Sequence, residues 1–203
     1  LDETHLGANP IEQFKLWLRE AEAAEIFEPN AFVLGTIDAA GQPTSRTVLL
    51  KGLDDEGFFF ATNYLSRKGS ALETNRKASA VFGWYSMYRQ VLIEGVAHRV
   101  PGAESDAYFA SRPHDSQVAA WSSHQSAPIE NRAALDKQFD DALAKFEGTD
   151  VPRPEYWGGY RIVPTRIEFW KGRSNRMHDR IVFERSIDAG GTPGEWNIGR
   201  LQP

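Results

Sequence analysis

The sequence predicts a mainly β protein with flanking helices (α+β), in which antiparallel strands form a closed or nearly closed barrel. Three observations predict this class. Several apolar runs are rich in aromatic and β-branched residues, which is typical of strands. Turn sequences such as "AAGQP" and "DDEG" join consecutive runs, and short turns connect antiparallel neighbours. Helical segments lie between the strands, so closure would remove exposed sheet edges while these helices pack outside.

The first predicted element is a helix over about residues 10–25. Asn9 and Pro10 suit a helix start, because they are an N-cap residue followed by proline in the first turn. Ile11 and Phe14 then begin a run of apolar residues at helical spacing. Similar signals predict further helices at residues 66–75, 102–112, 115–123 and 129–148.

The strands are expected mostly as hairpin pairs, the last pair being joined around "GRSN". Pro164 falls inside a strand-like run, and because proline cannot donate a ladder hydrogen bond, a bulge or a sheet edge is expected there. The chain has no internal repeat, low-complexity tract or interdomain linker, so we expect one domain over residues 1–203. The predicted strands cover residues 31–38, 44–53, 58–64, 78–86, 88–100, 160–172 and 175–186.

Composition excludes several classes of protein. The chain has 203 residues, 41% hydrophobic and 25% charged, so it is large enough for a globular core. Its formal net charge of −5 argues against a general nucleic-acid binder. The absence of cysteine excludes disulfides, thiolate catalysis and thiolate metal sites. No apolar run approaches the roughly 20 residues of a membrane span, and no signal peptide is evident, so we expect a cytoplasmic protein without a membrane partner.

Several common catalytic and nucleotide-binding patterns are missing. The five histidines show no pair at i, i+4 and no adjacent acidic pattern, so no metal site is expected. The sequence has no Gly-x-Gly-x-x-Gly or Walker-type loop, which argues against a Rossmann or P-loop nucleotide site. It also has no Gly-x-Ser-x-Gly elbow. The six tryptophans are most simply core and interface residues.

The stretch "EFWKGRSNRMHDRIVFER" at residues 168–185 carries a row of cationic residues. A strand places residues i, i+2 and i+4 on one face. If a strand begins near Asn175, then Arg176, His178 and Arg180 share that face. Because aligned positive charges repel, we expect an anionic ligand against them. Acidic residues on neighbouring strands are the alternative partner.

Three other segments carry the residue types that bind phosphate, which are Arg and Lys, hydroxyl groups and free backbone amides. The segment "TNYLSRKGS" places two cations in the first turn of a predicted helix, where backbone amides also point outward. Each segment alone is more often part of a solvated surface, but together they indicate an anionic ligand. The residues are Ser45, Arg46 and Lys51, then Arg67 and Lys68, then Tyr108 and Arg112 at i, i+4 on one helical face, with Ser116 beyond them.

From about Pro10 to Pro203 the chain resembles the pyridoxine/pyridoxamine 5′-phosphate oxidase family. The resemblance rests on "RTVLLKG", "TNYLSRKG", "RQVLIEG", "YFASRPHDSQ", "SSHQS", "WGGYRI", "EFWKGRSNRMHDR" and "RLQP", which occur in family order with family-like spacing. The "SRP–DSQ" and "EFW…NR-HDR" patterns are the most specific. The resemblance implies an FMN-binding split β-barrel, and a homodimer with two FMN sites at the subunit interface.

The same resemblance implies roles for individual residues. Arg176 and His178 would be the catalytic residues and would lie over the substrate's pyridine ring, while Arg180 would contact FMN. The substrate phosphate would be bound by Lys51, Tyr108, Arg112 and Ser116. The residues implied to contact FMN are Arg46, Thr47, Val48, Leu49, Leu50, Lys51, Ala61, Thr62, Arg67, Lys68, Gln90, Gln125, Ser126, Trp170 and Arg180.

The implied reaction is FMN-dependent oxidation of pyridoxamine 5′-phosphate or pyridoxine 5′-phosphate to pyridoxal 5′-phosphate in vitamin B6 biosynthesis or salvage. Molecular oxygen would yield hydrogen peroxide, and the amine would also release ammonia. One alternative is a sibling flavoenzyme acting on another small aromatic, as in phenazine biosynthesis. The other is a non-catalytic protein that only binds FMN or pyridoxal phosphate. The phosphate-binding set argues against the first, and Arg176 and His178 argue against the second.

Overall fold

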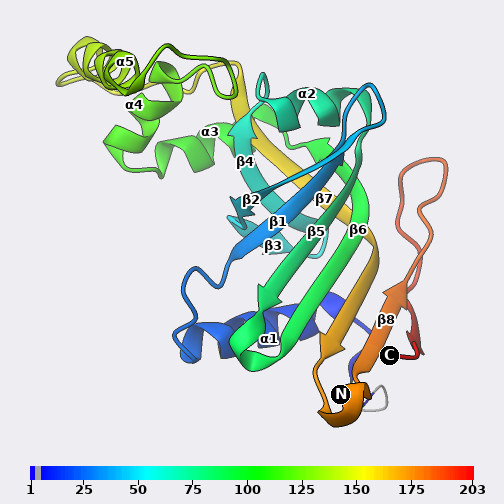
Figure 1. Cartoon of the computed structure of the whole chain (residues 1–203). Helices are drawn as coiled ribbons and strands as arrows, with labels where there is room; N and C mark the ends of the chain where they lie inside the picture. The colour runs from blue at the N-terminus through cyan, green and yellow to red at the C-terminus, as the bar shows by residue number, and fades with distance from the viewer. Residues whose placement is uncertain (3–5) are drawn as a thin grey trace.

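The computed structural model describes residues 1–2 and 6–203, in which antiparallel strands form one curled sheet with helices around it (Figure 1). The hydrogen-bonded order is β2-β1-β5-β6-β7-β4-β3, with β8 beside β7 and β9 beside β8. This order ends at β2 and β3 and does not return to its start, so the sheet is not a closed barrel. The predicted class, an antiparallel and mainly β protein with flanking helices, is confirmed. The strands are β1 (Ala31–Ile37), β2 (Pro43–Leu49), β3 (Gly52–Asp54), β4 (Gly57–Asn63), β5 (Lys77–Trp84), β6 (Arg89–Arg99), β7 (Trp157–Lys171), β8 (Asp179–Glu184) and β9 (Asn197–Arg200).

The long strand β7 organises the sheet, because it pairs with β6 along its length and changes its other partner midway. Residues 157–162 pair with β4, and residues 166–171 pair with β8. Pro164 lies at this change of partner. Neither β4 nor β8 pairs with β7 at that residue, so the missing N–H of Pro164 costs the sheet no hydrogen bond. The register with β6 also shifts beside Pro164, with Thr165 as the extra residue. The predicted bulge is therefore confirmed.

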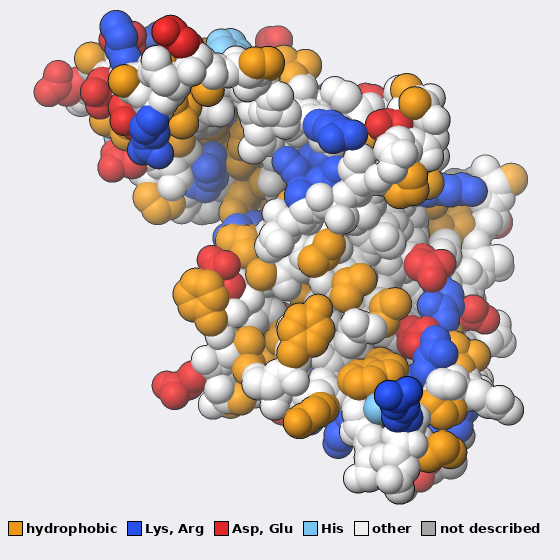
Figure 2. Space-filling view, viewed as in Figure 1, with side chains coloured by type: hydrophobic (Ala, Val, Ile, Leu, Met, Phe, Trp, Pro, Cys, Tyr) orange, Lys and Arg blue, Asp and Glu red, His pale blue; other side chains and the backbone are white. Residues whose placement is uncertain are grey.

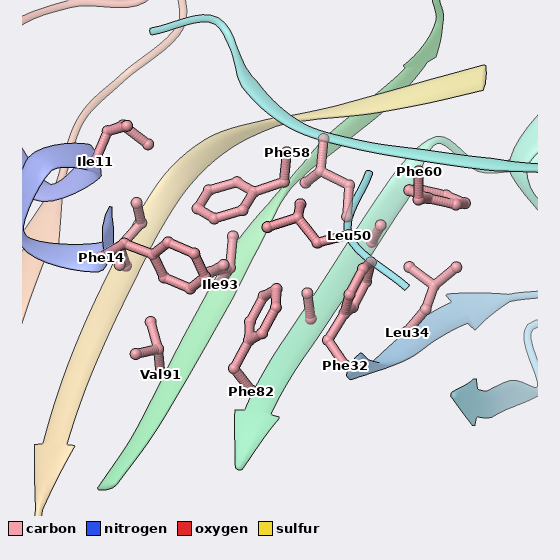
Figure 3. Packing of buried hydrophobic residues seen from close by; sticks show 14 of the residues in the cluster. Ile11, Phe14, Phe32, Leu34, Leu50, Phe58, Phe60, Phe82, Val91 and Ile93 are labelled. Carbon is pink, nitrogen blue, oxygen red and sulfur yellow. The ribbon is translucent and has the colours of Figure 1, made fainter. Parts of the chain in front are cut away.

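The main hydrophobic core fills the concave side of the sheet and is closed by α1 (Pro10–Ala23) (Figure 3). The side chain of Asn9 accepts a hydrogen bond from the Ile11 amide at 2.9 Å, which confirms the predicted cap. Phe14 is fully buried, and its ring packs 4.7 Å from that of Phe82 and 5.0 Å from that of Phe58. The apolar face of α1 therefore anchors the helix against the strands.

A second hydrophobic cluster joins three helices to the start of β7, and it forms the lobe at the upper left of Figure 1. Its buried members include Phe109, Val118, Phe146 and Trp157. None of the helices in the described part of the chain is long and apolar enough to cross a membrane. The helices outside α1 are α2 (Arg67–Thr74), α3 (Gly102–Ala110), α4 (His114–Ser122) and α5 (Arg132–Lys145), with short 3₁₀ turns η2 (Tyr85–Met87) and η3 (Ser174–Arg176).

Two predicted strands differ from the structure. The predicted strand at residues 44–53 is divided into β2 and β3, because the Leu50 amide still bonds back toward β1 while the Lys51 amide donates to the Phe59 carbonyl on β4. The chain changes partner at this corner.

The second difference lies at the late hairpin, where β8 begins at Asp179 rather than near Asn175. Asn175 and Arg176 have φ angles of 58° and 60°, in the left-handed region that a strand cannot contain. The prediction that Arg176, His178 and Arg180 form an i, i+2, i+4 row on one strand is therefore wrong.

Candidate active site

A cavity of about 620 Å³ lies where the ends of β2 and β4 meet α2, α3, α4 and the start of β7. It brings together eleven of the predicted site residues from distant segments. These are Thr47, Val48, Leu49, Lys51, Ala61, Thr62, Lys68, Tyr108, Arg112, Ser116 and Gln125. The remaining lining residues are Asn63, Pro113, Ala119, Ala120, Ser123 and Trp157.

The lining of this cavity is cationic. Lys51, Lys68 and Arg112 line it, and no described Asp or Glu does, although the whole chain carries a formal charge of −5. Figure 2 shows Lys and Arg side chains gathered in the hollow between the helical lobe and the sheet. Burial lowers the pKa of Lys68 below its ordinary value, and the nearby Arg46 charge lowers it further. An anion in the cavity would offset this unfavourable burial of charge.

The first turn of α2 forms one wall of this region. The Lys68 ammonium donates to Thr62 Oγ1 at 3.2 Å and to Gln125 Oε1 at 3.1 Å, both of which are neutral acceptors. The Arg67 amide donates to Ser126 Oγ at 3.2 Å. Arg67, Gln125 and Ser126 also line an adjacent hollow of about 480 Å³. A helix N-terminus with two cations and two polar side chains suits a phosphate group.

Two predicted site residues, Arg46 on β2 and Leu50 directly after it, do not line the cavity. The Arg46 guanidinium donates to the Leu34 carbonyl at 3.1 Å and to the hydroxyls of Thr36 and Thr44. Burial lowers the pKa of Arg46, and the nearby Arg67 charge contributes in the same direction. Leu50 is buried in the main core. In this structure Arg46 is bonded to β1 and β2, and Leu50 belongs to the core, so neither lines the cavity.

Tyr108 and Arg112 both line the cavity, but they do not share a helical face as predicted. The helix α3 ends at Ala110, and Arg112 follows the C-cap residue Ser111. Arg112 instead reaches the cavity from the turn before α4, whose first turn carries Ser116. Its Nη1 atom is buried and has no hydrogen-bond partner among the described residues. A half-buried guanidinium with one buried, unused donor suits an anionic ligand.

The other predicted residues lie at the opposite end of the sheet, which we call the hairpin end (residues 168–180 and the adjoining end of β6). Gln90, Trp170 and Arg180 are cross-strand neighbours on β6, β7 and β8. The His178 ring lies 4.7 Å from the Trp170 ring. The Arg173 amide donates to His178 Nδ1 at 3.1 Å, so the proton of the neutral imidazole is on Nε2.

Carboxylates balance two of the arginines at the hairpin end. The Arg180 Nε and Nη2 atoms donate to the two oxygens of Glu168 at 2.7 and 3.1 Å. Burial alone would raise the pKa of Glu168, but hydrogen bonds from Arg180 and Arg166 hold it below its ordinary value. Asp179 accepts hydrogen bonds from Arg173 Nε at 2.7 Å and from Arg200 Nη1 of β9 at 2.9 Å. The acidic partner considered for the cationic row is thus confirmed for Arg180.

The cavity and the hairpin end are far apart within one chain. The strand β7 starts at the cavity with Trp157 and reaches the hairpin end at Trp170 (Figure 1). At about 3.3 Å per residue, its 15 residues extend roughly 45 Å along the sheet. One FMN molecule cannot touch both groups of one chain. The structure therefore divides the predicted site residues into two groups that do not meet in a monomer.

Sequence reasoning missed several residues at these two ends. Trp157 lines the cavity beneath Arg112, and its motif "WGGYRI" marked the family without indicating a role. Asn63 also lines the cavity, next to the predicted Thr62. Glu168 and Asp179 lie inside the motif "EFW…NR-HDR", where an acidic residue beside arginines could have signalled an ion pair.

Comparison with known proteins shows relatives over the whole chain. Residues 18–146 match the family model described as "Pyridoxamine 5'-phosphate oxidase", and residues 157–203 match that described as "Pyridoxine 5'-phosphate oxidase C-terminal dimerisation region". The chain is 50% identical over 205 residues to the pyridoxine/pyridoxamine 5′-phosphate oxidase of Thermobifida fusca, covering 100% of this chain and 92% of that protein. It is 50% identical over 203 residues to that of Cupriavidus necator, covering 100% and 93%.

Solved structures share the fold. PhzG from Burkholderia lata 383, in complex with tetrahydrophenazine-1-carboxylic acid, superposes with a TM-score of 0.91 at 33% identity, covering 100% of this chain and 98% of that one. A pyridoxamine 5′-phosphate oxidase-related, FMN binding protein from Nostoc punctiforme gives a TM-score of 0.73 at 12% identity, covering 96% and 98%, which shows the fold alone. With the family models and the full-length relatives, these similarities confirm the predicted resemblance, and the chain belongs to the pyridoxine/pyridoxamine 5′-phosphate oxidase family.

Proposed function

We propose that the protein oxidises pyridoxamine 5′-phosphate or pyridoxine 5′-phosphate to pyridoxal 5′-phosphate, using FMN and molecular oxygen and releasing hydrogen peroxide. The amine substrate would also release ammonia. The observation that carries the proposal is the cavity that Lys51, Lys68 and Arg112 line without any described carboxylate. Such a cavity suits phosphorylated ligands, and both the cofactor and the substrate carry a phosphate group.

The residues at the N-terminus of α2 fit the phosphate of FMN. Arg67 and Lys68 supply charge there, Gln125 accepts a hydrogen bond from Lys68, and Ser126 accepts one from the Arg67 amide. When bound, FMN would supply the redox chemistry as a hydride acceptor, with molecular oxygen as the final electron acceptor. The protein's own task is to bind and orient the two ligands against each other.

A homodimer would complete the site. Residues 157–203, which contain residues 168–180 of the hairpin end, match a model described as a dimerisation region. We infer that the hairpin end of one subunit meets the cavity of the other, because the two groups are too far apart within one chain. Gln90, Trp170 and Arg180 would then contact FMN bound to the partner's cavity, and each dimer would hold two equivalent sites.

The substrate would be held at both of its ends. Lys51, Tyr108, Arg112 and Ser116 would bind its phosphate within the cavity. From the partner's hairpin end, Arg176 and His178 would lie over the pyridine ring. Because the Arg173 amide occupies His178 Nδ1, His178 would present Nε2–H toward the substrate. In the turn between β7 and β8, Asn175 and Arg176 have left-handed backbone conformations. Such strained conformations are common where a side chain must be positioned for function.

Anaerobic reduction of the flavin tests the proposal directly. FMN-loaded protein mixed with pyridoxine 5′-phosphate is expected to lose its yellow absorbance, and to recover it when oxygen is admitted, with hydrogen peroxide and pyridoxal 5′-phosphate in equal amounts. Pyridoxine without the phosphate serves as the control and is expected to react far more slowly. A flavin that stays oxidised in the presence of pyridoxine 5′-phosphate would rule out this activity.

A second candidate is a sibling flavoenzyme acting on a carboxylated aromatic, and the superposition with PhzG favours considering it. The identity to that structure is 33%, compared with 50% to the oxidases from Thermobifida fusca and Cupriavidus necator. The same anaerobic assay distinguishes the two functions. Flavin bleaching by tetrahydrophenazine-1-carboxylic acid and not by pyridoxine 5′-phosphate would establish the sibling activity.

A further inference from the structure

Trp157, the first residue of β7, supports two residues of the proposed phosphate site. The Tyr108 ring lies nearly parallel to the Trp157 indole, with ring centroids 6.1 Å apart and 9° between the planes. The guanidinium carbon of Arg112 lies 4.6 Å from the centroid of the same indole. Both distances fall within the range of favourable aromatic and cation–π contacts. A single side chain therefore contacts both Tyr108 and Arg112.

Arg112 depends on this contact because it lacks a carboxylate partner in the described part of the chain. Its Nη1 atom is buried and makes no hydrogen bond. Burial lowers the pKa of Arg112 below its ordinary value, and Tyr108 opposes this only in part. The negative face of the Trp157 indole, with that of Phe109 at 5.5 Å, offsets some of the cost of burying the charge. The unused donor stays available for a ligand.

Trp157 itself is rigidly held. The residue is 8% exposed, and its ring packs edge-on against the Phe109 ring at 5.0 Å. Its amide donates to the Pro154 carbonyl at 3.0 Å, and its carbonyl accepts from Arg153 Nη1 at 2.6 Å. It also pairs with Asn63 of β4. A strand residue fixed at this many points can hold its neighbours in one geometry before any ligand arrives.

We propose that Trp157 is a positioning residue that gives the site its preference for phosphorylated substrates. Its indole keeps Arg112 and Tyr108 oriented so that their polar atoms can bind the phosphate, without touching the phosphate itself. This inference rests on the proposed function, since it concerns the phosphate end of that substrate. Loss of the indole would let the guanidinium turn away, so affinity for the phosphate would fall while contacts with the pyridine ring remain.

The test compares two unreactive ligands, 4-deoxypyridoxine 5′-phosphate and 4-deoxypyridoxine, by calorimetric titration of the FMN-loaded protein. In Trp157→Leu, the dissociation constant of the phosphorylated ligand is expected to rise about 10- to 100-fold, which is less than a desolvated cation–π contact and a ring stack would supply together, because both contacts also exist in the ligand-free protein. Affinity for the ligand without phosphate is expected to be unchanged. Trp157→Phe keeps an aromatic face and is expected to recover most of the loss.

Trp121→Leu is the matched control. Trp121 packs against the same hydrophobic cluster and also has a cation near its ring, Lys145 at 4.8 Å, but it does not line the cavity. It is expected to lower stability without changing the preference for the phosphorylated ligand. If Trp157→Leu, or Trp157→Phe where the leucine variant does not fold, weakens both ligands equally, the role of Trp157 is overturned. Wild-type protein that binds both ligands equally would instead overturn the proposed function.

Discussion

The two ends of the sheet treat positive charge in opposite ways. At the cavity, Lys68 donates only to neutral oxygens, and Arg112 lies over an indole with one donor unused. At the hairpin end, Arg180 shares a two-point ion pair with Glu168, and Arg173 pairs with Asp179. Both ends are cationic in sequence, but the cavity lining contains no described carboxylate, whereas two arginines of the hairpin end are paired with acids.

This difference separates residues that bind a ligand from residues that hold a shape. A partly buried cation without a counter-charge lowers the stability of the ligand-free protein, so it is retained where a ligand will neutralise it. A buried ion pair fixes local geometry, and removing one partner leaves an uncompensated charge. We therefore expect substitutions at the cavity to change ligand affinity, and substitutions of the paired acids at the hairpin end to change stability and positioning.

The largest effect is expected from removing Arg67 and Lys68 together at the cavity end. The double alanine variant should bind FMN about 10²- to 10⁴-fold more weakly, because each charged hydrogen bond contributes roughly 1.5–3 kcal/mol. Riboflavin has no phosphate to lose, so its affinity should change little. Quenching of flavin fluorescence measures both constants. Arg132 and Lys137 on the exposed face of α5 provide a matched pair whose removal should affect neither, and equal loss of the two flavins would contradict the assignment.

The next effect concerns Arg176, a residue at the hairpin end that carries no ion pair among the described residues. Arg176→Ala should remain yellow and dimeric, but flavin reduction by pyridoxine 5′-phosphate should slow about 100-fold or more, since a freely tilting ring is poorly aligned. Flavin reoxidation by oxygen should be unchanged. Stopped-flow spectroscopy separates the two half-reactions. Normal reduction together with loss of FMN would make Arg176 a cofactor ligand instead.

Mixing inactive variants tests whether the two ends meet across the dimer. The Arg67/Lys68 double alanine variant has an intact hairpin end, and Arg176→Ala has an intact cavity. Heterodimers formed by unfolding and refolding an equal mixture should contain one complete site, and activity should recover to about a quarter of wild type for random pairing in a symmetric dimer. Sedimentation should show a dimer throughout. If both groups acted within one chain, mixing would restore nothing.

Stability should respond with opposite sign at the two ends. Glu168→Gln is expected to destabilise the FMN-free protein by about 2–4 kcal/mol, less than for a fully buried pair because Arg180 is partly exposed. Lys68→Met should stabilise it instead. The control Glu94→Gln removes an exposed partner of Arg166 and should cost less than about 1 kcal/mol. Urea unfolding measures all three, and a destabilised Lys68→Met protein would undermine the contrast between the two ends.

The smallest expected effect is a pH dependence of that Lys68→Met gain. Burial, with a contribution from Arg46, lowers the pKa of Lys68 from its ordinary 10.5. Between the folded-state pKa and 10.5 the unfolded chain therefore binds more protons, so wild-type stability gains from this group as pH rises. The advantage of Lys68→Met should be full below this window and shrink toward 10.5. Urea unfolding at a series of alkaline pH values measures it, and a constant advantage would show that Lys68 is not destabilised by burial.

Features that depend on nearby residues were predictable from the sequence alone. The start of α1 is confirmed because a cap needs only Asn9 and the residues of the next turn. The bulge at Pro164 follows from the missing N–H of that residue itself. The ordered motifs from Pro10 to Pro203 were sufficient for the family, because they preserve residue types and spacing together.

Only the tertiary structure decided which cations are paired and which are available to a ligand. The Arg180–Glu168 pair depends on the β7–β8 register, since a slip of one residue would turn Arg180 to the other face of the sheet. Arg176 does not lie in the predicted row. The left-handed φ angles of Asn175 and Arg176 interrupt the extended backbone, so the strand β8 begins only at Asp179. Trp157 lies under Arg112 only because β7 packs against the end of α3. Charge compensation is set by distance through space, which the order of residues along the chain does not specify.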